Sequence, residues 1–172
     1  MDDTQPLGEA APSSVCRAIA ARLARTADPG RRRKIVAACA RIARPWAEEL
    51  LWEALADPNE GVRDIVVKGL ADRPASLNPA WAARRLRRPP WYGKSSALAV
   101  IGRRKLREAL PEIDAAIGDP NADVRRAAAE ALGLIGGDQA VGLLVRLRKD
   151  ANPYVRAAAE EAIAKTSAVR FS

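Results

Sequence analysis

Residues 119–133 read DPNADVRRAAAEALG, and this stretch recurs along the chain at a fixed spacing. Weaker copies begin at Asp57, with DPNEGVRDIVVKGLA, and at Asp150, with DANPYVRAAAEEAIA, so the starts differ by multiples of 31 residues. A period of this length is typical of an array of equal supersecondary units. The alignment of the copies therefore predicts the architecture of the whole chain.

Three columns of the 31-residue alignment support one register. One column is basic in every repeat, the column four residues earlier holds mostly helix N-cap residues, and the column seven residues later is apolar. Pro29 and Pro153 follow their caps at the first helical position, which suits proline. The columns are Arg32, Arg63, Lys94, Arg125 and Arg156; Asp28, Asn59, Pro90, Asn121 and Asn152; and Cys39, Leu70, Ile101, Leu132 and Ile163.

A second apolar stripe precedes each of these helices, so each repeat is predicted to be a helix pair. The expected helices span residues 13–25, 29–42, 45–56, 60–71, 78–87, 91–103, 106–118, 122–135, 138–149 and 153–166. One pair of short helices cannot bury its own apolar face, so consecutive pairs must stack into an all-α solenoid. Cys16 and Cys39 fall on apolar positions and are expected to be buried thiols.

The predicted domain organisation is simple. Five repeats occupy residues 13–167, preceded by an acidic tail at 1–12 that is expected to be disordered and followed by a C-terminal tail at 168–172. The N-terminal tail is acidic where a signal peptide would be basic and then apolar, and no apolar run approaches the length of a membrane span. We therefore expect a cytoplasmic protein that has no membrane contact.

The motif D-P-N-x-x-V-R-x-x-A-x-x-A-L-G at 119–133 and its copies resemble bacterial HEAT-like repeats, including the short form named after phycobilisome lyase subunits. The segment WYGKSSALAVIG, residues 91–102, resembles a variant in which an aromatic pair precedes the basic residue. The resemblance covers nearly the whole chain and implies a right-handed α-solenoid of about five HEAT-like helix pairs. It implies little about function, because the family includes scaffolds, chromophore-handling proteins, tRNA-binding appendages and DNA glycosylases.

Composition argues against catalysis. The 172 residues include no His and only two Cys, which excludes His-based metal sites and His-activated nucleophiles. The glycosylase branch of the family needs a carboxylate beside aromatic residues, and the aromatic third repeat contains no Asp or Glu. We predict no catalytic residue, no cofactor and no metal site, and hence a protein that is not an enzyme.

Positive charge is segregated along the chain, whose net charge is +8. Arg73 to Arg107 contains ten basic residues and no acid, and residues 13–47 contain nine basic residues against Asp28 alone. Cations with nearby rings would suit an anionic partner, although the rings could instead fill space between repeats. The candidate binding residues are Arg84, Arg85, Arg87, Arg88, Trp91, Tyr92, Lys94, Arg103, Arg104, Lys105 and Arg107.

The basic column has two possible roles. It could line a ligand groove, but we favour a structural ladder in which each cation pairs with an aspartate six residues earlier. The ladder residues would be Asp57 with Arg63, Asp119 with Arg125, and Asp150 with Arg156. Arg88 holds the aspartate position of the third repeat, so the ladder is expected to break there, opposite Lys94.

Two functions fit these observations. The first is a non-enzymatic scaffold whose inner surface, lined by the second helix of each repeat, binds an acidic protein or peptide. The alternative is a DNA- or RNA-binding solenoid that uses the basic segments of repeats 1 and 3. Convergence of those segments on one face would favour the alternative, and dispersal would favour the scaffold. The sequence predicts no particular oligomeric state.

Overall fold

The computed structural model describes residues 14–73 and 77–169. This part of the chain contains helices and no strand. In chain order, the helices are α1 (Ser14–Arg25), α2 (Pro29–Ala40), α3 (Pro45–Ala54), α4 (Glu60–Ala71), α5 (Pro79–Leu86), α6 (Trp91–Arg103), the 3-10 helix η1 (Arg107–Ala109), α7 (Leu110–Ala116), α8 (Ala122–Ile135), α9 (Asp138–Leu147) and α10 (Pro153–Val169).

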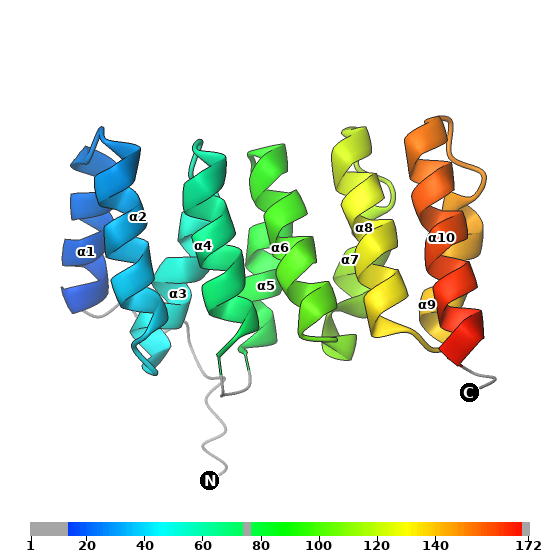
Figure 1. Cartoon of the computed structure of the whole chain (residues 1–172), viewed down its shortest axis with the longest axis horizontal. Helices are drawn as coiled ribbons and strands as arrows, with labels where there is room; N and C mark the ends of the chain where they lie inside the picture. Colours follow the sequence, from blue (N-terminus) through cyan, green and yellow to red (C-terminus); the bar gives the residue numbers. More distant parts are fainter. Residues whose placement is uncertain (1–13, 74–76, 170–172) are drawn as a thin grey trace, which may run out of the picture.

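The helices form two layers (Figure 1). The even-numbered helices stand in one row, and the odd-numbered helices stand in a second row behind them. Each odd–even pair is one repeat, and the repeats stack in series from α1 to α10. The turns inside the repeats lie along the edge that is uppermost in Figure 1, and the links between repeats lie along the opposite edge. The prediction of an all-α solenoid is confirmed.

Side-chain caps set the starts of the even helices. Asp28 accepts a hydrogen bond from the Arg31 backbone N–H at 2.7 Å, and Asn121 accepts one from the Asp123 N–H at 2.8 Å. Asn59 and Asn152 cap α4 and α10 in the same way. Pro90 precedes α6 and provides no such bond. The predicted caps are confirmed, and α6 is the one even helix that begins without a side-chain cap.

One apolar core runs through all repeats. The predicted apolar column is almost entirely buried, with Leu70, Ile101 and Leu132 each 0% exposed. Cys16 and Cys39 are also buried, and burial raises the pKa of both thiols. The prediction that these cysteines are buried is therefore confirmed.

Small residues bring the even helices close together. A Cβ atom on Gly133 would lie 2.7 Å from the Ala162 Cβ, and a Cβ atom on Gly102 would lie 2.8 Å from the Ala131 Cα. No side chain fits at these distances, so glycine is what permits this approach. The even helices accordingly contact one another more extensively than the odd helices do.

The structure differs from the predicted elements in two places. The helix expected over 106–118 is a 3-10 turn at Arg107–Ala109 followed by the shorter α7, in which Pro111 stands near the start. Proline fits the first turn of a helix but not its interior, which explains the later start. Helix α10 extends to Val169, into the tail expected from 168, whereas the predicted N-terminal tail, 1–12, lies outside the described residues.

Candidate interaction surface

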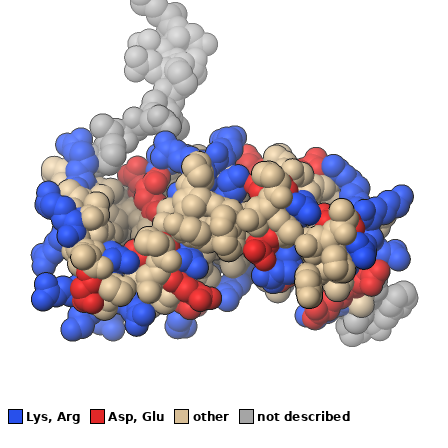
Figure 2. All heavy atoms as spheres, turned by 90° about the horizontal axis from the view of Figure 1, so that it is seen from above, with Lys and Arg blue, Asp and Glu red and all other residues tan. Residues whose placement is uncertain are grey.

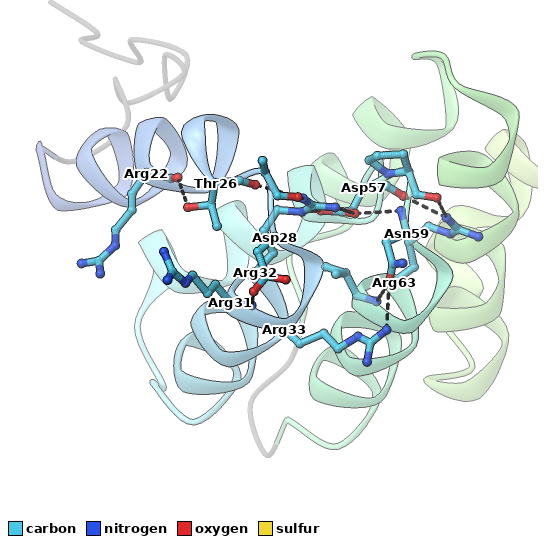
Figure 3. Close-up of polar contacts among 12 residues, drawn as sticks. Arg22, Thr26, Asp28, Arg31, Arg32, Arg33, Asp57, Asn59 and Arg63 are labelled. Carbon is cyan, nitrogen blue, oxygen red and sulfur yellow. Dashed lines mark hydrogen bonds and ion pairs between the residues drawn. The ribbon is translucent and has the colours of Figure 1, made fainter.

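A ladder of ion pairs links successive repeats along the edge formed by the turns, and Figure 3 shows its first pair, Arg32 with Asp57. Arg32 donates from Nε and Nη2 to the two carboxylate oxygens of Asp57, at 2.7 and 3.0 Å. Arg125 binds Asp150 in the same bidentate manner, at 2.7 and 2.9 Å. Lys94 donates to Asp119 at 2.7 Å. In each pair the acid lies 25 residues after the cation and therefore belongs to the next repeat.

The predicted pairing of each arginine with the aspartate six residues earlier is wrong in the acceptor: the arginine binds the backbone carbonyl of that aspartate and not its carboxylate. Arg63 donates to the backbone carbonyl of Asp57 at 2.9 Å, and Arg125 and Arg156 bind the carbonyls of Asp119 and Asp150 in the same way. Each arginine thus fastens the turn of its own repeat through carbonyl groups. The aspartate carboxylate instead receives the cation of the preceding repeat, and it also accepts a backbone N–H two residues later.

The ladder pairs are largely shielded from water. The side chains of Arg125 and Asp150 are 17% and 8% exposed, so their attraction is screened less than that of a surface pair. The hydrogen bond from Arg125 lowers the pKa of Asp150, and the same bond raises the pKa of Arg125. The Asp150 carboxylate therefore stays ionised at pH values below the usual pKa of an aspartate.

The ladder has one gap, at the junction of repeats 2 and 3. The residue 25 positions after Arg63 is Arg88, so the acid expected from the other repeats is replaced by a cation. The guanidinium carbon of Arg63 lies 4.8 Å from the centre of the Tyr92 ring instead. Lys94 keeps its partner Asp119, so the expectation that the break lies opposite Lys94 is wrong: the residue that loses its acid is Arg63.

Arginines also fasten the opposite edge, where the repeats are joined. Arg73, which is 5% exposed, donates to the carbonyl of Ile42 at 2.9 Å and to that of Arg44 at 3.3 Å. Arg104 donates to the carbonyls of Ala71 and Arg73. These two residues belong to the basic run that the sequence suggested as a binding segment, but their guanidinium groups bind backbone carbonyls in the link before α3 and at the end of α4.

Several other candidate binding residues are also occupied by internal contacts. Arg84 forms ion pairs with Glu53 at 2.9 Å and Glu49 at 3.4 Å, and Arg88 lies 3.6 Å from Glu53. Arg85 is 4% exposed and donates to the carbonyls of Arg88 and Pro89. Burial lowers the pKa of Arg85. These contacts show that part of the charge in the third repeat is structural.

The exposed members of the candidate set fall into two groups. Arg87, Arg88 and Trp91, the last 46% exposed, lie just before or at the start of α6, whereas Arg103 ends this helix and Lys105 and Arg107 follow it. A helix of 13 residues separates the groups by about 20 Å. The predicted residues therefore do not form one continuous site.

The first repeat and the link that follows it carry a larger exposed set of cations. Each of these side chains is exposed, and none forms an ion pair with another described residue. The end of the molecule that contains α1 and α2, at the left of Figure 2, is bordered by Lys and Arg. We call this set the first-repeat basic surface: Arg17, Arg22, Arg25, Arg31, Arg33, Lys34, Arg41 and Arg44. Its signal in the sequence is the run of nine basic residues in 13–47, but sequence reasoning favours the acid-free run of the third repeat instead.

On α4, α8 and α10, some cations are paired with acids nearby. Lys68 pairs with Asp72, Arg126 pairs with Glu130, and Lys165 pairs with Glu161, all four residues apart on one helix. In Figure 2, acidic side chains stand between the basic ones beyond the first repeat. The even layer is therefore not one positive groove.

A hollow of about 390 Å³ opens in the odd layer near the same end. Cys16, Ala20 and Leu23 of α1 and Leu50 of α3 give it an apolar lining, and Glu53 and Arg84 stand at it as a charged pair. Among the described residues, no group of three or more His, Cys, Asp or Glu side chains is placed to hold a metal ion. No helix in this part of the chain is long and apolar enough to cross a membrane.

Comparison with known families shows that residues 78–164, which are half of the chain, match the family of HEAT repeats. The ladder, the two layers and this match together define the class of protein. The chain belongs to the HEAT-repeat family. Comparison with curated protein sequences gives no match.

Two solved structures resemble this chain in fold. Human deoxyhypusine hydroxylase in complex with glycerol matches 70% of this chain with a TM-score of 0.58 at 24% identity, and the chain spans only 43% of that protein. An engineered protein matches 89% of the chain, and 79% of its own length, with a TM-score of 0.51 at 16% identity. These likenesses concern the fold.

Proposed function

We propose that this protein is a non-enzymatic HEAT-repeat scaffold that binds an acidic protein or peptide, and that the first-repeat basic surface is its main contact. The observation that carries the proposal is the contrast in charge pairing. Eight exposed cations in the first repeat and the link that follows it have no acidic partner among the described residues, whereas α4, α8 and α10 each pair a cation with an acid four residues away. Unpaired surface charge attracts a partner of opposite sign and orients it.

The fold supports a binding role because a solenoid offers a long surface that contacts few residues of its own chain. Arg31, Arg33 and Lys34 share the first turns of α2, so a single partner segment could contact them together. Arg33 also hydrogen-bonds Asn59 of the next repeat, which ties this surface to the second repeat (Figure 3).

The experiment compares two charge reversals of equal size. Arg33→Glu with Lys34→Glu removes cations from the first-repeat basic surface, and Arg148→Glu with Lys149→Glu makes the same change near the other end. Partners captured from the native cell are identified for each protein by mass spectrometry. We expect the first variant to lose the wild-type protein partners and the second to keep them. Equal retention by both variants would contradict the proposal.

Nucleic acid is the second candidate, favoured by the same unpaired arginines and lysines. When a protein binds duplex DNA through its phosphates, the logarithm of the binding constant falls linearly with the logarithm of the salt concentration. The slope is about −0.9 for each phosphate contacted. Binding of a DNA or RNA duplex is therefore measured at several salt concentrations, with capture repeated after nuclease treatment. If the captured partners are lost after nuclease treatment and duplex binding depends steeply on salt, the protein is a nucleic-acid-binding solenoid and not a protein scaffold.

A further inference from the structure

The gap in the ladder leaves a partly buried arginine without the carboxylate that its counterparts have. Arg63 uses Nη1 for the carbonyls of Asp57 and Pro58, as Arg125 does for its own turn. In Arg32 and Arg125, Nε and Nη2 then bind an aspartate. In Arg63 no described residue accepts a hydrogen bond from these two nitrogens, and the Tyr92 ring faces the guanidinium.

Arg85 is a second arginine near this junction with a nitrogen that lacks an acceptor. It is 4% exposed, and its Nε has no hydrogen-bond partner among the described residues. That nitrogen lies 3.3 Å from the position that a Cβ of Gly93 would take, so it faces the first turn of α6. The guanidinium of Arg85 donates to the carbonyls of Arg88 and Pro89. A buried guanidinium nitrogen without an acceptor is costly, and an acid brought to this junction would lower that cost.

The start of α6 adds to the positive potential. The other even helices begin with a side-chain oxygen on their first N–H groups, whereas Pro90 supplies none. The positive end of a helix dipole favours a carboxylate when no side chain neutralises it. Of the nearby acids, Glu49 and Glu53 are bound by Arg84, and Arg88 lies 3.6 Å from Glu53.

We propose that this junction is a receptor for an Asp or Glu side chain of the bound partner, which takes the place of the aspartate missing at residue 88. Arg63 and Arg88 hold the carboxylate, and the exposed ring of Trp91, set edge to face against Tyr92 at 5.7 Å, contacts the neighbouring partner residue. The inference rests on the proposed function and names where an acidic segment of the partner docks.

The ligand chemistry follows from the ladder itself. Three other junctions hold a carboxylate at the equivalent position at 2.7 Å, so the spacing of the repeats already suits this group. The bidentate geometry of Arg32 and Arg125 shows what Arg63 offers to a planar carboxylate. The rings of Trp91 and Tyr92 beside the arginines favour a peptide ligand, because a peptide carries other side chains next to its acidic residue.

The test uses the full chain and an octaglutamate peptide that is acetylated and amidated, so that only side-chain carboxylates are present. Binding is followed by titration and by the Nε–H signals of the arginines in nitrogen-15 NMR spectra. The matched variants are Arg88→Asp, which supplies the missing acid from the chain, and Arg148→Asp, which makes the same charge change on an exposed residue near the other end. Inorganic phosphate at equal ionic strength is the second probe.

We expect the peptide to shift the Arg63 Nε–H signal, and its affinity to fall about tenfold in Arg88→Asp but less than threefold in Arg148→Asp. Equal affinities in the two variants, or an unmoved Arg63 signal, would overturn the receptor. The same holds if the peptide does not bind at low salt, or if phosphate shifts Arg63 as strongly as the peptide does. Unfolding of Arg88→Asp at a temperature no lower than that of the wild type establishes that the variant is folded.

Failure of this inference can be told apart from failure of the proposed function. Suppose that Arg33→Glu with Lys34→Glu abolishes capture of protein partners while Arg88→Asp leaves octaglutamate affinity unchanged. The proposed scaffold function is then supported, and the proposed carboxylate receptor is contradicted. If the first-repeat reversal leaves partner capture unchanged but Arg88→Asp weakens peptide binding, the role of the first-repeat basic surface is contradicted and the carboxylate receptor is supported.

Discussion

Two junctions of the solenoid hold their neighbouring repeats together by different contacts. Between repeats 4 and 5, Arg125 binds Asp150 and Gly133 approaches Ala162 closely. Between repeats 2 and 3, the acid is absent, and the alignment places Ala71 and Val100 where the other junction has glycine and alanine. Helices α8 and α10 accordingly contact each other more extensively than α4 and α6.

The stack nevertheless continues through the looser junction, because its apolar core is unbroken. Val66, Leu70, Leu98 and Ile101 are each 0% exposed there. Burial of apolar side chains is thus the common cause of stacking, and the ladder is a local addition that fastens turns and sets the register between repeats.

The largest expected effect tests that common cause. Leu132→Ala and Leu70→Ala remove fully buried side chains from the same column at the two junctions. Each should lower the free energy of unfolding by about 2–5 kcal/mol through lost burial and a residual cavity. Urea unfolding followed by circular dichroism measures both, with Leu134→Ala, an exposed site, as control. A small effect at Leu70 alone would mean that the two junctions differ in their cores as well.

The next effect concerns the close approach of α8 and α10. Gly133→Ala places a Cβ atom 2.7 Å from the Ala162 Cβ and 3.2 Å from its Cα, and should cost about 1–3 kcal/mol of stability through overpacking. Gly142→Ala in α9 has no atom within 4 Å and should instead stabilise the protein by about 0.5–1 kcal/mol. Thermal unfolding of the two variants should therefore shift in opposite directions.

Breaking the intact ladder should be somewhat less costly. Asp150→Ala removes the carboxylate that Arg125 and the Asn152 N–H bind, and it leaves a partly buried guanidinium without its acid. The expected loss is about 1–2 kcal/mol in the free energy of unfolding. Arg63→Ala, at the junction that has no carboxylate, serves as the comparison and should cost less. An equal loss would show that the carbonyl contacts, which both arginines share, dominate.

Repairing the gap should have a smaller effect of opposite sign. Arg88→Asp gives Arg63 the partner that Arg32 and Arg125 already have, at the expense of the contact between Arg88 and Glu53. We expect a gain of less than about 1 kcal/mol, because the lost and the new pairs partly offset each other. A calorimetric melting temperature below that of the wild type would indicate that the cation at residue 88 is itself stabilising.

Acidification should reduce the difference between the junctions. The pKa of Asp150 is lowered by Arg125, so in the window between its folded and unfolded pKa values the unfolded chain binds more protons. The stability from this pair is present above the usual aspartate pKa of about 3.9 and is lost as the pH falls through the lower folded value. The wild type and Asp150→Asn should therefore converge in stability at low pH. A gap that stays constant down to that range would exclude ionisation of Asp150 as its source.

The repeat pattern made most of the fold predictable from the sequence. Caps such as Asn121 and the apolar column at Leu132 act within one helix or between equivalent helices, so a correct register suffices to place them. The helix over 106–118 was the exception, because Pro111 delays α7, and a periodic pattern does not encode that local constraint.

The candidate site was less predictable, since contacts of an arginine depend on which turns are stacked. Pairing of Arg32 with Asp57 crosses a repeat boundary, and an offset of 25 residues is meaningful only once adjacent turns are known to lie side by side. The charge of Arg73 and Arg85 was visible, but a charge count cannot show that carbonyl groups bind these side chains inside the molecule.

The unequal packing of the two layers also fixes how the solenoid can bend. The even helices already meet at glycine and alanine at Gly102 and Gly133, so that layer has no slack left for compression. The odd helices contact one another less, and the hollow beside Leu50 lies among them. A partner that bends the molecule would therefore change the spacing of the odd helices more easily than it would bring α6, α8 and α10 closer together.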